Sequence, residues 1–442
     1  MIAGVGMGSR TDVATNVVLR DLDGSNVVWV ELSGGQHHGS ITSAGGSTIS
    51  EAIDLAADLG IPVALVIDSS GSDVFEGLAA LHAWGLIARS LTRASGVVPT
   101  IIGVTGACVS GPALLLGLAD LVVMTETAFA FVTGPQAVTE FTGIQTDRHG
   151  LGGASIHDTS SGLAAIVVSG PVAVAGAIET LLSYLPSNSL SDPPVSDTHD
   201  PKDRLCDRAA TSIPSAPTGG FDVRHVIEDV VDEHSFVEIR ASYAPNVVTG
   251  FGRLDSRSVG IVANQPQNRA GTLDIEASRK AARFVSLCDA FNLPIVTLVD
   301  TPGFEPGKDL EWRGMIRHGA ELAHAYCEAT VPRICVIMRK SFGGAYIVMD
   351  SRGVGNDLCF AWPCAEIAVM GAAGAMQILR SDSTTKVDYE EDFLNPYRAA
   401  ERGYVDAVIH PSETRIALCS GLSQLQMKRS LGRPRKHSNS PM

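Results

Sequence analysis

The sequence predicts an α/β protein built from two tandem domains of the same architecture. A strand-like run and a small-residue turn occur twice: Val98-Pro99 and Ser110-Gly111 recur 233 residues later (331 − 98 and 343 − 110) as Val331-Pro332 and Gly343-Gly344. The 442 residues, of which 45% are hydrophobic, are enough to bury two cores of ordinary size.

The first domain begins with the strand-like segments VVLR and VVWVEL between residues 17 and 32. A helix is expected from about Ser50 to Gly60, because glycine suits the left-handed residue that ends many helices. A strand, VALVIDS, follows and ends near Asp68. The apolar stretch from Leu163 to Ile178 is broken by a Ser-Gly-Pro sequence and is too short to cross a bilayer, so a buried helix is expected there.

The second domain repeats this order. Apolar residues recur at helical spacing before Asn292 and predict a helix; they are Ala281, Phe284, Val285 and Cys288. The strand IVTLVDT then ends near Asp300, which lies 232 residues after Asp68 (300 − 68). A further strand from Ile334 to Met338 leads into the turn Gly343-Gly344-Ala345, after which a helix is expected.

Composition sets the expected boundaries. We expect an N-terminal domain over residues 1–190, a linker over 191–220 that is rich in Pro, Ser and Asp, a C-terminal domain over 221–430 and a basic tail over 431–442. Basic residues gather in and just before this tail; they are Lys428, Arg429, Arg433, Arg435 and Lys436. We expect a solvated terminus, with a subunit contact or phosphate capture as the alternative.

Charge and cysteine content argue against several classes of function. The net charge of −15 argues against a nucleic acid or an acidic membrane as partner. Eight cysteines without a CxxC pair argue against a zinc ribbon, and His37-His38 has no further ligands at metal-binding spacing, so no metal is expected. Because no basic segment precedes an apolar core at the N-terminus, we expect a cytoplasmic protein without a signal peptide.

The turn at Gly343-Gly344-Ala345 is a candidate oxyanion hole. Glycine lets backbone N–H groups approach a ligand oxygen without a Cβ in the way, and a helix that starts here adds its positive end. Ser110-Gly111 occupies the corresponding place in the first domain.

Many longer segments then carry a family resemblance. They are EGLAAL, SGVVP, FVTGP and LGGASIH in the first half, and NQPQNRAGTLDIEASRKAARFVSLCDAFNLPIVTLVDTPGFEPG, RHGAELAHAYCEATVP, RKSFGGAYIVM, AWPCAEIAVMGAAGA and NPYRAAERGYVDAVI in the second. From about Gly45 to Arg415 the chain resembles the carboxyltransferase β subunits of biotin-dependent acyl-CoA carboxylases, such as propionyl-CoA carboxylase, in the crotonase superfamily.

The resemblance implies two tandem crotonase-like ββα-spiral domains. Acyl-CoA would be held mainly by the N-terminal domain of one subunit, and carboxybiotin, on a separate carrier protein, by the C-terminal domain of its neighbour. The partners would be a biotin carboxylase and a biotin carboxyl carrier subunit, and the oligomer a dimer-based hexamer.

The resemblance also implies roles for individual residues. Gly344 and Ala345 would hold the biotin ureido oxygen, and the Ser110-Gly111 region would hold the thioester oxygen. The residues expected to contact biotin are Gly343, Tyr346, Gly371 and Ala372, and those expected to contact acyl-CoA are Ile347, Gly71, Gly134 and Pro135. Transfer of CO2 between these groups puts negative charge on carbonyl oxygens, so backbone N–H donors would be the main catalytic groups.

The chain departs from the usual sequence of the family at three positions. It has Ser110 where the family usually has glycine, Asp73 where the family usually has arginine, and Ile347 where carboxylases that favour propionyl-CoA usually have aspartate. The resemblance implies a short-chain acyl-CoA as substrate, either propionyl-CoA or acetyl-CoA, and Ile347 does not fix the choice. A decarboxylase of malonyl-type thioesters and a non-catalytic scaffolding subunit stay open as alternatives.

Other polar residues have simpler interpretations. His318 is expected to be a hydrogen-bonded helix histidine rather than a general base. Asp68 and Asp300 are expected to cap the helices that follow them, and Glu140 is expected to be a surface carboxylate.

Overall fold

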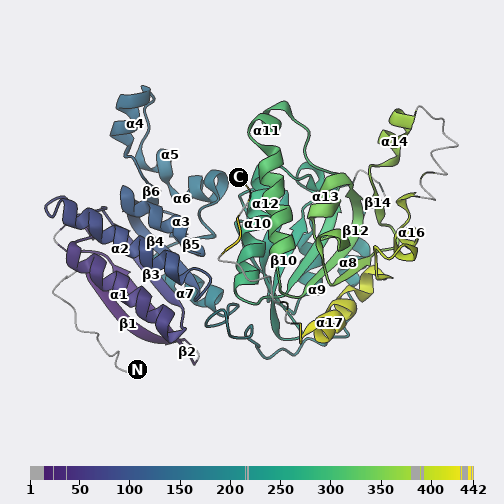
Figure 1. Ribbon diagram of the computed structural model, residues 1–442, viewed down its shortest axis with the longest axis horizontal. Helices are drawn as coiled ribbons and strands as arrows, with labels where there is room; N and C mark the ends of the chain where they lie inside the picture. The colour runs from purple at the N-terminus through teal and green to yellow at the C-terminus, as the bar shows by residue number, and fades with distance from the viewer. Residues whose placement is uncertain are drawn as a thin grey trace. The chain divides into compact units, whose positions relative to one another are not determined.

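The computed structural model describes residues 14–22, 24–35, 37–214, 216, 219–379, 389, 393–428, 430, 437–439 and 441. The chain divides into two compact units, Met1–Asp192 and Pro193–Met442, which are drawn in Figure 1. Each unit contains its own β-sheet and its own helices. The predicted α/β class with two sheet-containing domains is confirmed.

The first unit alternates strands with helices. Its described strands are β1 (Thr15–Leu22), β2 (Ser25–Leu32), β3 (Val63–Ser69), β4 (Thr100–Val109), β5 (Leu121–Thr125), β6 (Phe129–Phe131) and β7 (Ile166–Val168). Its described α-helices are α1 (Ser43–Leu59), α2 (Leu78–Ala94), α3 (Leu115–Leu118), α4 (Pro135–Thr142), α5 (Arg148–Gly152), α6 (Ala154–Ile156) and α7 (Pro171–Leu182). The predicted strands near residues 17–32 and the strand ending near Asp68 are confirmed, and Gly60 ends α1 in the left-handed conformation.

The sheet of the first unit has the order β1-β2-β3-β4-β5-β7, with β6 paired to β4. β1 and β2 are antiparallel, and the pairs from β2 onward are parallel. Parallel strands need crossover helices and are usually covered on both faces. The loops that follow β2, β3 and β4 therefore meet at one edge of the sheet.

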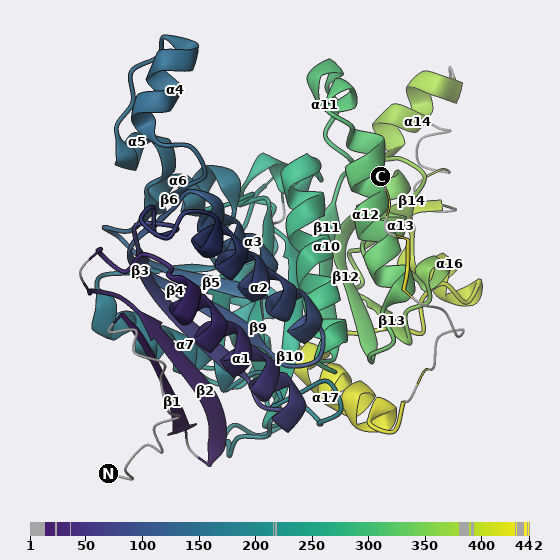
Figure 2. The same ribbon diagram turned by 60° about the vertical axis from the view of Figure 1, so that its left-hand side comes forward.

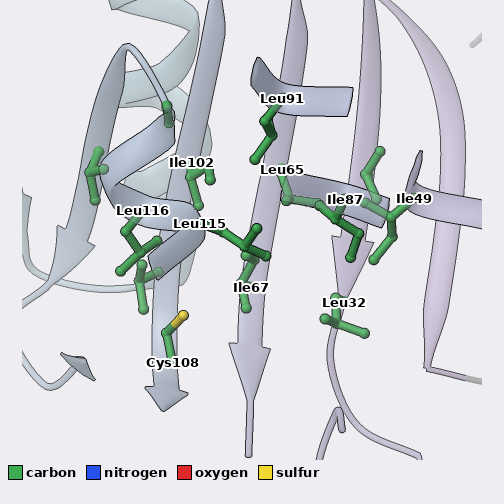
Figure 3. Close-up of a cluster of buried hydrophobic side chains, with 14 of the residues drawn as sticks. Leu32, Ile49, Leu65, Ile67, Ile87, Leu91, Ile102, Cys108, Leu115 and Leu116 are labelled. Carbon is green, nitrogen blue, oxygen red and sulfur yellow. The ribbon is translucent and has the colours of Figure 1, made fainter. Parts of the chain in front are cut away.

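Helices cover both faces of this sheet. Figure 3 shows Leu65, Ile102 and other strand residues packed with Ile49, Ile87 and Leu91 from α1 and α2, which Figures 1 and 2 show side by side. The opposite face packs against α7: a Cβ on Gly103 would lie 2.5 Å from Val174 Cγ1. Alternate strand residues thus face different helices, as the two-residue period of a strand requires.

The second unit repeats the same alternation. Its described strands are β8 (Val237–Ile239), β9 (Val247–Leu254), β10 (Arg257–Asn264), β11 (Ile295–Thr301), β12 (Arg333–Phe342), β13 (Leu358–Ala361), β14 (Glu366–Ala368) and β15 (Ala407–Val408). Its described α-helices are α8 (Asp207–Ser212), α9 (Arg224–Val230), α10 (Ile275–Ala290), α11 (Lys308–Trp312), α12 (Met315–Glu328), α13 (Gly343–Val348), α14 (Ala372–Leu379), α16 (Pro396–Glu401) and α17 (Thr414–Leu425). The four apolar residues that predicted a helix before Asn292 are all buried on α10.

The sheet of the second unit has the order β15-β13-β12-β11-β10-β9-β8, with β14 paired to β12. β9 and β10 are antiparallel like β1 and β2, and the strands β10 to β13 are parallel like β2 to β5. One face packs against α10, where a Cβ on Gly260 would meet Cys288 Sγ, and the other packs against α9 and α17. The predicted repeat of one architecture is confirmed.

Two expectations differ from the structure. The stretch from Leu163 to Ile178, expected to be one buried helix, contains β7 and then α7, because Pro171 can begin a helix but cannot lie inside one. The expected linker over 191–220 belongs largely to the second unit. In it Cys206 is buried in the core, and Arg415 Nε donates to Pro201 O at 2.9 Å.

No helix among the described residues is long and apolar enough to span a membrane, and the cytoplasmic location stays a prediction. Of the basic residues near the C-terminus, Lys428 is not free in solvent: its Nζ lies 2.8 Å from Asp357 Oδ2 and donates to Val331 O. Arg429, Arg433, Arg435 and Lys436 lie outside the described residues.

Candidate functional site

Each of the two predicted turns follows a strand that changes partners. β12 pairs with β13 over Ile334–Ile337 and then with β14 over Lys340–Phe342. β4 likewise pairs with β5 over Ile101–Val104 and then with β6 over Ala107–Val109. We call this arrangement a forked strand, and the turn in each unit lies directly after its fork.

An aspartate on the strand beside each forked strand accepts a hydrogen bond from the backbone of the forked strand. The pairing of β3 with β4 shifts register around Asp68, and the pairing of β11 with β12 shifts register around Asp300. At the shift, Asp68 Oδ1 accepts the N–H of Ala107 at 2.8 Å, and Asp300 Oδ1 accepts the N–H of Lys340 at 3.1 Å. The prediction that these residues cap the following helices is wrong. Their carboxylates instead bond to backbone N–H groups of the neighbouring strand at the register shift.

The two aspartates differ in their charge partners. Asp300 is fully buried and pairs with Arg339, whose Nη2 lies 2.9 Å from Oδ2. Burial raises the pKa of the Asp300 carboxyl, although the neighbouring Arg339 opposes this rise. Asp68 is exposed, and the position matching Arg339 in the first unit is Gly106 (339 − 233), where a Cβ would lie 2.3 Å from Asp68 Oδ1.

The turn of the second unit presents backbone N–H groups at the start of α13. Gly343 has φ +61°, a conformation that suits glycine, and Gly344 is exposed while Ala345 is buried. The N–H groups of the first helical turn have no intrahelical acceptor, and no side chain caps this end of α13. A Cβ on Gly344 would lie 3.4 Å from the ring of Phe304, so this ring borders the turn.

The other residues predicted to contact biotin or the acyl group surround this turn. Ile347 on α13 is 43% exposed, and burial raises the pKa of the Tyr346 phenol. A Cβ on Gly371 would lie 3.2 Å from the ring of Phe342, and Ala372 belongs to a small buried cluster with the same phenylalanine. The structure therefore brings these residues together with Gly343, Gly344 and Ala345.

The turn of the first unit has a different geometry. Ser110 has φ +67° and ψ −152°, a region that side chains other than glycine rarely adopt, and its N–H donates to Phe131 O at 2.8 Å. Gly111 follows at the start of a short 3₁₀ turn, Gly111–Leu114, and a Cβ on it would lie 3.1 Å from the Trp84 ring. Among the described residues, the buried Trp84 Nε1 has no hydrogen-bond partner.

The remaining residues predicted for acyl-CoA lie on both sides of this turn. Gly71 has φ +104°, and a Cβ on it would lie 3.0 Å from Val109 O. Gly134 and Pro135 begin α4, which projects from the sheet in Figure 1 and buries none of its residues. They connect to the turn through β6, because Phe131 O accepts the Ser110 N–H.

Asp73, which stands where arginine is usual in the family, is paired rather than free. His37 Nδ1 lies 2.6 Å from Asp73 Oδ2, and Ser40 Oγ donates to the same oxygen at 2.9 Å. The hydrogen bond from His37 is the main cause that lowers the pKa of the Asp73 carboxyl. The negative charge at this position therefore lies against an imidazole and does not face solvent alone.

The simpler interpretations of two other residues agree with the structure. His318 is nearly buried on α12, and its Nδ1 lies 2.9 Å from Glu321 Oε1. Glu140 is exposed on α4 and accepts a hydrogen bond from Gln136. The part of the chain that the structure describes contains no group of three or more His, Cys, Asp or Glu side chains placed to hold a metal ion.

Sequence reasoning missed three residues that shape the turns: Arg339, Trp84 and Phe304. A signal for Arg339 was present, because Asp68 and Asp300 repeat at nearly the same offset as the turns and a buried aspartate needs a partner. Trp84 and Phe304 reach the turns through tertiary packing, for which a single sequence carries no local pattern.

Comparisons with known proteins extend over both units. A family model described as the carboxyl transferase domain matches residues 13–440. The carboxyltransferase subunit of propionyl-CoA carboxylase from Haloferax mediterranei is 44% identical over 417 residues, which cover 91% of this chain and 81% of that protein. Methylmalonyl-CoA decarboxylase subunit alpha from Veillonella parvula is 43% identical over 393 residues, with 88% and 77% covered. A crystal structure of transcarboxylase 12S with hydrolysed methylmalonyl-coenzyme A matches with a TM-score of 0.96 at 37% identity, covering 100% of this chain and 90% of that one.

Proposed function

The chain belongs to the carboxyl transferase family, and from this premise we propose that it is the carboxyltransferase subunit of an acyl-CoA carboxylase of the propionyl-CoA type. Its acyl acceptor is a short-chain acyl-CoA, either propionyl-CoA or acetyl-CoA. Carboxybiotin, attached to a separate carrier protein, supplies the carboxyl group. The similarity to the Haloferax mediterranei subunit along both units supports this activity.

One observation carries the chemical part of the proposal: a forked strand in each unit leads directly into a turn with backbone N–H donors. Carboxyl transfer to a thioester requires charge to develop on a carbonyl oxygen. Preorganised N–H donors stabilise that charge, and each such donor contributes about 3–4 kcal/mol to the transition state in related chemistry.

The turn of the second unit fits the ureido oxygen of biotin. Gly344 is exposed and lacks a Cβ, so a ligand oxygen can approach its N–H, whereas Ala345, the second proposed donor, is buried. The positive end of α13 faces the same place. Phe304 borders this turn. Tyr346, Gly371 and Ala372 would contact the ring system of biotin.

The turn of the first unit fits the thioester oxygen through Gly111. The Ser110 N–H is already bonded to Phe131 O, so Ser110 contributes the shape of the turn and Gly111 contributes the donor. Gly71 allows the loop after β3 to approach Val109 and Ser110 closely. Gly134 and Pro135 would contact the CoA portion from the start of α4.

The proposed partners are a biotin carboxylase and a biotin carboxyl carrier subunit, and the proposed assembly is a dimer-based hexamer. The similarity to transcarboxylase 12S, which assembles as a hexamer, supports this oligomer. In such a dimer the first unit of one subunit and the second unit of the other would form the active site.

A decarboxylase is the second candidate. It is favoured by the 43% identity to the methylmalonyl-CoA decarboxylase subunit from Veillonella parvula. Cleavage of the carboxyl group would use the same stabilised thioester oxygen, because forward and reverse reactions share a transition state. The scaffolding alternative would keep the biotin turn while the turn at Ser110 holds no substrate.

The test is transfer of labelled CO2 from a carboxybiotinylated carrier protein to acetyl-, propionyl- or butyryl-CoA. Gly344→Pro removes one donor at a first-turn position where proline is tolerated, and we expect kcat to fall roughly 10²–10³-fold. Gly344→Ala keeps the N–H and adds a Cβ at ordinary contact distance from Phe304, so it measures the steric effect of a side chain separately from loss of the donor.

Transfer that is lost in Gly344→Pro and retained in Gly344→Ala would support the proposal. Activity in Gly344→Pro equal to that of the unmodified protein would contradict the role of this donor. Absence of transfer to every acyl-CoA would contradict the carboxyltransferase itself, and release of labelled CO2 from methylmalonyl-CoA would then favour the decarboxylase.

A further inference from the structure

The turn of the first unit has one backbone donor fewer than the turn of the second. Gly344 and Ala345 are the proposed donors of the second unit. Their counterparts 233 residues earlier (344 − 111 and 345 − 112) are Gly111 and Pro112. Proline has no backbone N–H, so the first unit has no counterpart of the Ala345 donor.

The neighbouring backbone N–H groups do not take its place. The Ser110 N–H donates to Phe131 O at 2.8 Å, and the Ala113 N–H donates to Ser110 O at 3.0 Å. Among the described residues, the Gly111 N–H has no acceptor. Within residues 110–113, all of which the structure describes, Gly111 alone therefore offers a free N–H to a ligand.

The indole of Trp84 brings a further donor to this turn. A Cβ on Gly111 would lie 3.1 Å from Trp84 Nε1 and 3.1 Å from Cε2, so the indole ring packs directly against the turn. Trp84 belongs to α2, which contacts the 3₁₀ turn, and its ring packs against the core of the first unit. This packing holds the ring in one position beside Gly111.

The indole N–H lacks an acceptor in the part of the chain that the structure describes. Trp84 Nε1 is buried and has no hydrogen-bond partner there. An indole nitrogen can only donate, and a buried donor has lost its hydrogen bond to water. Most buried polar groups in folded proteins have a partner, so this one calls for an acceptor that the chain itself does not supply. A ligand oxygen at the turn would be such an acceptor.

One oxygen can accept from both donors. Because N and Cβ of one residue lie about 2.5 Å apart, the Gly111 nitrogen and Trp84 Nε1 are separated by no more than about 5.6 Å. Two donors that each lie about 2.9 Å from a shared oxygen can be up to about 5.8 Å apart. The separation of the two nitrogens thus permits a shared acceptor.

We propose that Trp84 is a catalytic residue whose indole N–H replaces the backbone donor that Pro112 lacks. The thioester oxygen of acyl-CoA would then be held by the N–H groups of Gly111 and Trp84. The proposal rests on the proposed function, because it requires an acyl-CoA at this turn. Both hydrogen bonds strengthen as negative charge develops on the oxygen, and the indole keeps its proton throughout.

The first test is Trp84→Phe, which keeps an aromatic ring and removes the N–H. We expect kcat for CO2 transfer to propionyl-CoA to fall about 100-fold while KM changes less than about threefold, because the lost bond is strongest in the transition state. Trp29→Phe is the matched control. Its indole Nε1 bonds to Glu31 on β2, which β3 separates from β4, and transfer should stay within about twofold.

The second test restores the missing backbone donor. Pro112→Ala supplies an N–H at the position that matches Ala345. Combined with Trp84→Phe, it should raise kcat at least about tenfold above that of Trp84→Phe alone. Pro112→Ala in the unmodified background should gain far less, since two donors already serve the oxygen. This coupling between the two substitutions separates a lost donor from a packing defect, which a new N–H would not repair.

A third measurement does not depend on carboxyl transfer. The chain has four tryptophans, and the indole N–H signals of ¹⁵N-tryptophan-labelled protein can be followed by NMR. Trp84→Phe identifies the signal of Trp84 by its absence. Propionyl-CoA should move this signal downfield as the N–H gains an acceptor, whereas CoA without an acyl group should leave it in place.

The outcomes separate this proposal from the proposed function. Transfer that is equally fast in Trp84→Phe and the unmodified protein overturns the role of Trp84 and leaves the carboxyltransferase standing. A defect that Pro112→Ala does not repair, or an indole signal that propionyl-CoA does not move, also overturns it. Loss of transfer in Ser110→Ala but not in Trp84→Phe would assign the second donor to the Ser110 hydroxyl instead. A shifted indole signal without any transfer supports Trp84 as a donor and contradicts the carboxyltransferase.

Discussion

Asp68 and Asp300 occupy the same place in the two units and make the same contact, each accepting a backbone N–H from the strand that follows it. Their acceptor distances are 2.8 Å to the Ala107 nitrogen and 3.1 Å to the Lys340 nitrogen. The environments differ, since Asp300 is buried beside Arg339 and Asp68 is exposed beside a glycine. The contact is thus common to both forks, whereas the ion pair belongs to the second unit.

Substitution of these two aspartates should therefore have unequal effects. Asp300→Asn keeps an oxygen for the Lys340 N–H but leaves Arg339 buried without its counter-charge, so we expect a loss of about 3–5 kcal/mol in the free energy of unfolding. Asp68→Asn changes an exposed group and should cost no more than about 0.5 kcal/mol. Urea unfolding of both variants tests this, and equal losses would contradict it.

Ser110→Gly should stabilise the first unit. Ser110 holds a backbone conformation that costs about 1–3 kcal/mol for a residue with a side chain, and glycine adopts it without that cost. The greater freedom of glycine in the unfolded chain offsets about 0.5–1 kcal/mol, so a net gain of about 1 kcal/mol is expected. Ser110→Ala retains the strained backbone and should show no gain in the same urea titration. A gain in both variants would assign the effect to the hydroxyl instead.

Asp350 should make stability depend on pH. It is fully buried, its Oδ1 lies 2.6 Å from Arg333 Nη1, and burial raises its pKa to about 6. The pKa of Asp350 is higher in the folded protein than in the unfolded chain. The contribution of Asp350 to the free energy of unfolding is therefore full below about pH 4 and is lost as pH rises through 6. The raised pKa corresponds to a contribution of at most about 3 kcal/mol.

Asp350→Asn removes this titration. Its free energy of unfolding, compared with that of the unmodified protein at intervals from pH 4 to pH 7.5, should fall less, or rise more, with increasing pH. Parallel pH profiles for the two proteins would show that Asp350 does not titrate in this range.

Ile347 should influence the choice of acyl chain. It is partly exposed on α13, directly beyond the turn that holds Gly344. A charged side chain here disfavours a longer apolar chain, and one methylene in an apolar pocket typically changes kcat/KM by roughly tenfold or more. We expect Ile347→Asp to lower kcat/KM for butyryl-CoA about tenfold relative to propionyl-CoA. Ile347→Leu keeps an apolar surface and should leave the ratio within about twofold; an unchanged ratio in Ile347→Asp would exclude this residue from the acyl pocket.

Most of the fold was predictable because its signals are local. The strand ending near Asp300 and the helix before Asn292 follow from apolar periodicity, and the repeat follows from a constant spacing of turns. The stretch over 193–214 was not predictable in the same way. Its Pro, Ser and Asp content is typical of a linker, yet Pro201 and Cys206 find partners through Arg415 and the core, which lie far away in the sequence.

The site divides along the same line. The turns that contain Gly344 and Gly111 could be predicted from the sequence, because their spacing is visible in the chain, and the roles of these residues as donors stay predictions. The contact between His37 and Asp73 spans 36 residues and exists because the loops after β2 and β3 meet. The assignment of Asp68 as a helix cap failed for a related reason, since a register shift between strands leaves no periodic trace in either strand.

The forked strands make the chain unequally tolerant of changes in length. Three residues, 126–128, connect β5 to β6, and four, 362–365, connect β13 to β14, and both connections are tied by tight backbone hydrogen bonds. An insertion in either would lengthen one arm of a fork and displace the strand beside a turn. At the opposite edge, residues 95–97 precede β4 in a loop that belongs to neither fork, so an insertion there would not lengthen an arm of a fork. We therefore expect the fold to tolerate inserted loops and affinity tags better at the amino ends of the strands than beside the forks.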